Sequence, residues 1–110
     1  MQRIAALHAA GESIATTAIN VEEIVRGLRP VEGQAAQRLF RGLTVLPIDA
    51  RAAWVAGEWR RDHAQRGVTL WQADCLVAAV AVVHRGALVT GNPKDFPMPE
   101  LTVEHWPVGE

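Results

Sequence analysis

The chain has 110 residues, which is enough for one domain and too few for two. Apolar residues make up 49% of it, so a hydrophobic core can form. The net charge of −1 gives no overall attraction to nucleic acid, so RNA or DNA binding would need a local basic patch or a bound metal. The single cysteine excludes an intramolecular disulfide and a zinc site of paired cysteines, and no apolar run reaches the roughly 18 residues of a membrane-spanning helix, so we expect a soluble, cytoplasmic protein.

The N-terminal half predicts short helices and strands in alternation. A helical spacing of apolar residues over 1–10 predicts the end of a helix, which Gly11 would close. The β-branched residues of 13–19 predict a strand. The segments that follow are expected to form a helix over 20–28, a helix over 32–41 and a strand over 43–48. The first of these helices begins at Asn20 and carries Glu23 three residues later, which is the pattern of a capping box.

The C-terminal half predicts two longer helices and then two strands. Asp49 is expected to cap a helix that runs to about residue 66, with an apolar stripe made of Ala52, Val55, Ala56 and Trp59. Asp74 is expected to begin a nearly all-apolar helix through His84, of the kind that is buried on most sides. Strands are expected over 87–90 and 101–106, with a turn-rich loop between them. This alternation predicts a single α/β domain over 1–110 with a mainly parallel sheet.

Three acidic residues stand out by their positions. Glu23 lies in the first turn of the predicted helix after the first strand, Asp74 opens the apolar helix, and Asp95 follows the strand over 87–90. A helix of a parallel α/β unit starts at the carboxyl edge of the sheet and runs back to the opposite edge, and the next strand returns to the first edge. The predicted helix over 74–84 would run back about 16 Å in this way. We therefore expect the three carboxylates at the edge where open α/β sheets bind ligands.

Two interpretations of these acids remain open from spacing alone. Converging carboxylates raise one another's pKa, a divalent cation removes that cost, and oxygen ligands favour Mg²⁺ or Mn²⁺ over zinc. Each acid also has a simpler role. Glu23 could only complete a capping box, Asp74 could only interact favourably with the helix dipole, and Asp95 could only fix a turn.

The C-terminal motif carries a family resemblance. Residues 74–81 read Asp-Cys-Leu-Val-Ala-Ala-Val-Ala, and residues 88–96 read Leu-Val-Thr-Gly-Asn-Pro-Lys-Asp-Phe. Together they resemble the second half of a PIN-domain toxin of the VapC type, in which an Asp opens an apolar helix and a short strand leads into Thr-x-Asn-x-x-Asp-Phe. Residues 20–28 are similar to the helix of that family that bears a glutamate, at the position of Glu23.

The resemblance implies both a fold and an activity. The fold is a PIN-like three-layer α/β fold with a mainly parallel sheet. The activity is metal-dependent endoribonuclease activity, as the toxin of a type II toxin–antitoxin system. The implied partners are an RNA substrate, a small antitoxin protein and a second copy in a homodimer. The implied catalytic and metal ligands for Mg²⁺ or Mn²⁺ are Glu23, Asp74 and Asp95, with Thr90 and Asn92 as substrate-binding residues beside them.

One departure from the family pattern opens an alternative. The family begins with a short apolar strand that ends in an aspartate, and residues 1–10 resemble only the end of the helix that follows it. We therefore expect the first strand and one carboxylate to be missing, which would leave unpaired backbone groups inside the sheet. The alternative function is a catalytically inactive or truncated PIN-like module that binds an antitoxin or a partner subunit. The helix with Trp54 and Trp59 offers an apolar patch for such a contact.

Other side chains predict less specific roles. Cys75 lies in an apolar helix and is expected to be a buried packing residue rather than a nucleophile. The four tryptophans are expected to serve in the core or in interfaces rather than in base stacking. Arg60, Arg61 and Arg66 form either a basic patch beside RNA or a solvated helix face.

Overall fold

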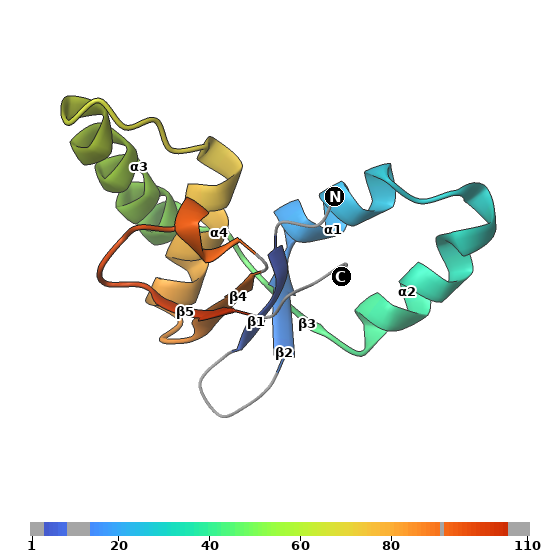
Figure 1. The fold of residues 1–110 in the computed structure, drawn as a ribbon. Coiled ribbons are helices and arrows are strands. Elements are labelled where there is room, and N and C mark those ends of the chain that lie inside the picture. The colour runs from blue at the N-terminus through green and yellow to red at the C-terminus, as the bar shows by residue number, and fades with distance from the viewer. Residues whose placement is uncertain (1–3, 9–13, 91, 106–110) are drawn as a thin grey trace.

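The computed structural model describes residues 4–8, 14–90 and 92–105 (Figure 1). Its strands are β1 (Ile4–His8), β2 (Ile14–Thr17), β3 (Thr44–Leu46), β4 (Ala87–Thr90) and β5 (Thr102–His105). Its α-helices are α1 (Ala18–Arg26), α2 (Gly33–Arg41), α3 (Ala50–Gln65) and α4 (Gln72–Val83). Two short 3-10 helices, η1 (Pro30–Glu32) and η2 (Pro93–Asp95), lie in the connections.

The strands form one sheet in the order β3-β2-β1-β4-β5. β2 pairs with β3 in parallel, β4 pairs with β5 in parallel, and β1 is antiparallel to both β2 and β4. Four of the five described strands, all except β1, therefore share one direction, which agrees with the predicted mainly parallel sheet. The sequence did not predict the reversed central strand.

The predicted helix over 1–10 is wrong where the structure describes it, because residues 4–8 form β1. β1 lies between β2 and β4 and pairs with both, with Leu7 opposite Ala15 on one side and Leu88 on the other. Long-range pairing of these backbone groups outweighs the local helical spacing of the side chains. The expectation of unpaired backbone groups inside the sheet is also wrong, since β1 fills that position. Residues 1–3 and 9–13, with Gly11, lie outside the described residues.

The start of α1 also differs from the prediction. The N-cap is Thr17, whose hydroxyl accepts a hydrogen bond from the Asn20 backbone N–H at 3.3 Å. The Asn20 side-chain oxygen accepts from the Thr17 backbone N–H at 3.3 Å and from its hydroxyl at 2.9 Å. Thr17 and Asn20, both buried, therefore form the capping box in place of Asn20 and Glu23. The helix begins three residues earlier than a cap at Asn20 would allow.

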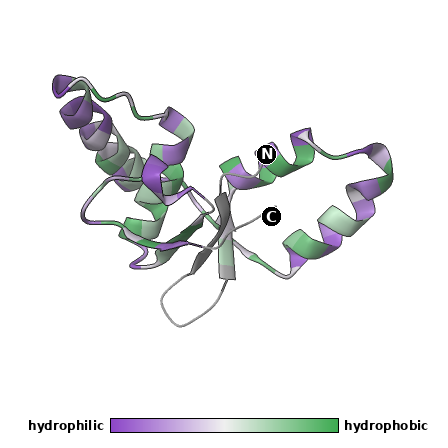
Figure 2. Cartoon of the chain, viewed as in Figure 1, coloured by the Kyte–Doolittle hydropathy of each residue, from purple (hydrophilic) through white to green (hydrophobic). Residues whose placement is uncertain are grey.

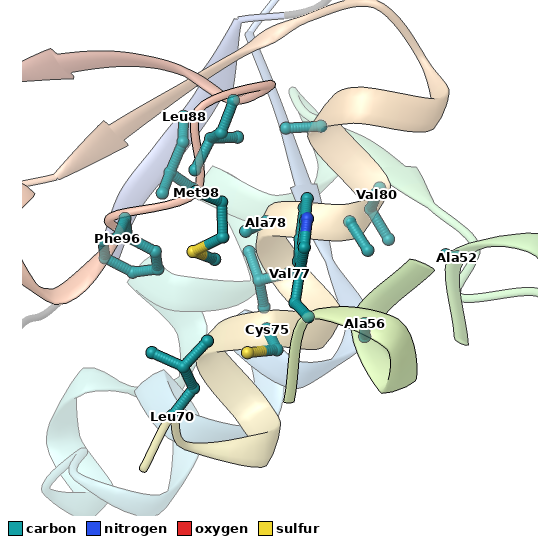
Figure 3. Packing of buried hydrophobic residues seen from close by; sticks show 14 of the residues in the cluster. Ala52, Ala56, Leu70, Cys75, Val77, Ala78, Val80, Leu88, Phe96 and Met98 are labelled. Atoms are coloured by element: carbon teal, nitrogen blue, oxygen red, sulfur yellow. The ribbon is translucent and has the colours of Figure 1, made fainter. Parts of the chain in front are cut away.

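The core lies between α4, α3 and the sheet (Figure 3). α4 is apolar along most of its length (Figure 2), and it packs against both α3 and β4. Asp49 caps α3 as predicted, accepting from the Ala52 backbone N–H at 3.0 Å. The predicted stripe of α3 faces the core, and Trp59 is part of it. The predicted patch of Trp54 and Trp59 is therefore wrong, because only Trp54 is exposed.

Helices α1 and α2 project from the sheet as an arm (Figure 1). Exposed apolar side chains lie on both helices of this arm, including Val25 on α1 and Leu39 on α2. Within the described residues, no helix combines the length and the apolar character that crossing a membrane requires.

Candidate functional site

The elements that carry the three acids meet at one edge of the sheet. β2 and β4 share one direction, α1 follows the carboxyl end of β2, and η2 follows the carboxyl end of β4. α4 runs back along the sheet before β4 and therefore begins at the same edge, as Figure 1 shows at the top of the sheet. The topology brings the starts of α1 and α4 and the turn η2 to the edge that the sequence predicts.

Asp74 lies in the first turn of α4, and only 4% of it is exposed. The helix begins at Gln72, two residues earlier than predicted, with Trp71 as the N-cap. The Cys75 backbone N–H donates to the Trp71 carbonyl at 3.0 Å, so the turn that holds Asp74 is regular. An interaction with the helix dipole favours a carboxylate here, but burying one is costly unless it is paired or bound to a cation.

Asp95 is held by a turn that does not depend on its carboxylate. The Thr90 hydroxyl, fully buried at the end of β4, accepts from the Asn92 backbone N–H at 3.0 Å. The backbone N–H groups of Asp95 and Phe96 then donate to Asn92 and Pro93, both at 3.0 Å. Among the described residues, these bonds and the buried Phe96 ring fix the turn, so the half-buried Asp95 carboxylate has no required part in it.

Glu23 is exposed on α1. Because the capping box consists of Thr17 and Asn20, Glu23 has no part in it, and the simpler role that the sequence allowed for Glu23 is removed. Its carboxylate lies on the helix that leaves the carboxyl edge of the sheet toward the arm.

The structure does not close the three acids into a compact cluster. Across residues 4–8, 14–90 and 92–105, no group of three or more His, Cys, Asp or Glu side chains lies close enough to hold one metal ion. Asp74 lies on α4, which contacts both β4 and α1, whereas Asp95 lies in the turn after β4 and Glu23 lies on the exposed side of α1. Repulsion between like charges opposes their approach unless a cation lies between them.

Cys75 is buried next to Asp74, as predicted for a packing residue. Burial raises the pKa of its thiol to about 11, while the charge of Arg60 lowers this pKa and that of Asp74 raises it. We expect Cys75 to be unreactive toward a disulfide reagent at pH 8 until the chain unfolds, because it is both covered and protonated. The labelling rate should rise to that of a free thiol in denaturant, and equally fast labelling of the folded chain would contradict this burial.

A model of the PIN domain matches residues 2–97. The chain belongs to the PIN-domain family. A curated relative, Ribonuclease VapC2 of Rickettsia felis, is 28% identical over 106 residues, which cover 91% of this chain and 79% of the relative.

Solved structures share the PIN fold of this chain. VapBC2 of Rickettsia felis bound to a DNA fragment from its promoter has a TM-score of 0.74 and 26% identity, covering 87% of this chain and 77% of the other. DNA-bound VapBC of Salmonella typhimurium has a TM-score of 0.69 and 28% identity, covering 82% and 73%. VapBC-1 of nontypeable Haemophilus influenzae has a TM-score of 0.78 and 20% identity, covering 87% of this chain and 76% of the other, and at this identity it shows the fold alone. The predicted PIN-like fold and the resemblance to VapC-type PIN domains are confirmed.

Proposed function

We propose that this PIN domain is a divalent-metal-dependent endoribonuclease and the toxin of a type II toxin–antitoxin pair. The observation that carries the proposal is the position of the buried Asp74 carboxylate at the carboxyl edge of the sheet, on a helix that packs against β4, the strand that leads into the turn with Asp95. Carboxylates at this edge of an α/β sheet lie where such sheets bind ligands, and their oxygens suit a divalent cation. The similarity to Ribonuclease VapC2 supports RNA as the substrate.

The donor atoms of this edge suit a hard cation. Asp74, Asp95 and Glu23 supply carboxylate oxygens, and Thr90 and Asn92 add a hydroxyl and an amide beside them. These oxygen donors favour Mg²⁺ or Mn²⁺. A cation bound there lowers the pKa of water and offsets the negative charge that develops on the phosphate during cleavage.

The surrounding residues fix the positions of the Asp74 and Asp95 carboxylates. Packing of α4 into the core fixes the position of Asp74, and the hydrogen-bonded turn fixes that of Asp95. The Thr90 hydroxyl is engaged by the Asn92 backbone, which leaves the Asn92 side-chain amide to contact a phosphate oxygen of the substrate. Glu23 would add a third carboxylate from α1, and it would have to approach the other two carboxylates to share a cation with them.

We also propose an antitoxin partner and a homodimer. The neighbouring structures are VapBC complexes, and the α1–α2 arm of this chain carries exposed apolar side chains. A shallow pocket of about 430 Å³ lies on α2, lined by Gln37, Phe40 and Arg41. Exposed apolar surface of this kind is typical of a protein–protein contact.

The competing function is a PIN-like module that only binds a partner. The separation of the three acids in the described structure favours it. Incubation of the purified chain with a mixed pool of single-stranded RNA separates the two functions. The nuclease proposal requires cleavage that EDTA abolishes and that excess Mg²⁺ or Mn²⁺ restores. Equal cleavage in EDTA, or no cleavage at any metal concentration, would overturn the proposal.

A further inference from the structure

Trp71 is a large apolar side chain that the structure leaves in solvent beside the candidate active site. It is 64% exposed and is the N-cap of α4, three residues before Asp74. Trp71 directly precedes the first turn of α4, which is the turn that carries Asp74. Trp71 therefore has no role in the core of this chain, one of the two roles predicted for the tryptophans.

Arg60 places a positive charge at the same point. Its Nε donates to the carbonyl of Leu70, the residue before Trp71, at 3.4 Å. In the part of the chain that the structure describes, this is the one hydrogen bond of Arg60, and it uses one of the five donors of the guanidinium. The charge of Arg60 also acts on Cys75, the residue after Asp74. Exposed Arg60 and Trp71 therefore adjoin each other at the start of α4.

Leu70 anchors this pair to the rigid part of the molecule. Its side chain is buried in the core cluster near Cys75, as Figure 3 shows. Trp71 follows this anchor with its side chain exposed, and the Arg60 head group is bonded to the Leu70 carbonyl. Because the backbone between them is anchored in the core, the positions from which the two side chains extend are fixed.

We propose that Trp71 and Arg60 form a substrate subsite next to the candidate active site, in which the indole stacks on one base of single-stranded RNA and the guanidinium binds a neighbouring phosphate. This inference rests on the proposed ribonuclease function. Single-stranded nucleic acid is commonly held by an aromatic platform together with basic side chains that follow the phosphates. The chain's net charge of −1 gives no general attraction to RNA, so binding has to come from local groups such as this pair or from a bound metal.

RNA fits this surface better than a protein partner does. Apart from Val68 in the same loop, the large exposed apolar side chains of the described structure lie on other elements, with Val25 and Leu39 on the arm, whereas Trp71 is accompanied by a cation and precedes a buried acid. An aromatic ring beside a guanidinium matches alternating bases and phosphates. A single-stranded RNA bound to Trp71 and Arg60 would pass the start of α4, where Asp74 lies.

Binding can be tested apart from cleavage by using a fluorescein-labelled single-stranded oligoribonucleotide and chains that all carry Asp95→Asn. Trp71→Ala should weaken binding by about 10- to 100-fold, and Trp71→Phe should retain most of the affinity, because a smaller ring still stacks. Trp54→Ala is the matched control, since Trp54 is 71% exposed but lies near the start of α3. Arg60→Ala should reduce the slope of log affinity against log salt by about 0.7, whereas Arg51→Ala, also near the start of α3, should not.

An abasic scan of the oligoribonucleotide identifies stacking itself. The chain with Trp71 should lose affinity at one abasic position, and Trp71→Ala should show no further loss there. Equal affinity of Trp71→Ala and Trp54→Ala overturns the proposal. It is also overturned if Trp71→Ala leaves RNA affinity unchanged but weakens self-association in sedimentation, because Trp71 is then a protein contact. A Trp71-dependent loss of binding without metal-dependent cleavage by the parent chain supports the subsite and contradicts only the proposed nuclease function.

Discussion

Replacement of Asp74 by Asn is expected to lower the rate of RNA cleavage by about 100-fold or more while the fold stays intact. A bound cation contributes several kcal/mol to the stability of the transition state, and each 1.36 kcal/mol corresponds to a tenfold change in rate. An amide keeps the shape of the carboxylate but not its charge, and Asp74 is only 4% exposed, so the change falls on the site rather than on the packing. The measurement is the single-turnover cleavage rate at saturating Mg²⁺.

The matched control for Asp74→Asn is Asp49→Asn. Asp49 also stands at the start of a helix, where its carboxylate accepts from the Ala52 backbone N–H at 3.0 Å. Asn is an equally good N-cap, so this variant loses the same charge without losing the cap. We expect Asp49→Asn to cleave at the parent rate and both variants to melt cooperatively. Full activity of Asp74→Asn would refute its role as a metal ligand.

Replacement of Leu88 by Ala is expected to destabilise the domain by about 2–5 kcal/mol. Leu88 is fully buried in β4, where its backbone pairs with β1 and β5. Removing its side chain leaves a cavity between the sheet and α4 that the close-packed core cannot fill. For a domain of this size, the melting temperature should fall by about 8 °C or more.

Leu39→Ala makes the same chemical change at a surface position. Leu39 is 57% exposed on α2, and surface substitutions usually change the free energy of unfolding by less than about 0.5 kcal/mol. Urea denaturation of the two variants should therefore separate them clearly. Similar free energies of unfolding for Leu88→Ala and Leu39→Ala would show that β4 does not occupy the centre of the core.

The longer elements could be predicted because local signals and burial agree. α3 begins at its Asp49 cap, buries its apolar stripe and is followed by Gly67, whose φ is 77°. α4 is apolar enough that only a buried position suits it. β1 could not be predicted, because its five residues have a helical spacing and their strand conformation depends on pairing with β2 and with β4, of which β4 lies about 80 residues away in the sequence.

The candidate site could be predicted in part for a similar reason. Chain order and strand direction place Asp74 and Asp95 at one edge, so their neighbourhood follows from the topology. The position of the α1 cap did not follow, because Thr17 with Asn20 and Asn20 with Glu23 both fit a capping pattern. Burial of Thr17 and Asn20 decides between them. The exposure of Trp71 depends on which side of α4 the sheet covers, and a single sequence does not contain that information.

The central claim is that Asp74, Asp95 and Glu23 share one divalent cation at the carboxyl edge of the sheet. The most direct measurement is an anomalous difference map from a crystal of the whole chain soaked in Mn²⁺. If the three residues share a cation, the map should show one strong peak within coordination distance, about 2.0–2.3 Å, of the Asp74 and Asp95 carboxylate oxygens. The Glu23 carboxylate should lie closer to this peak than it does to the other two carboxylates in the metal-free chain. A chain that cleaves RNA but holds Mn²⁺ elsewhere, or that shows no peak at this edge under the conditions of cleavage, would contradict the claim.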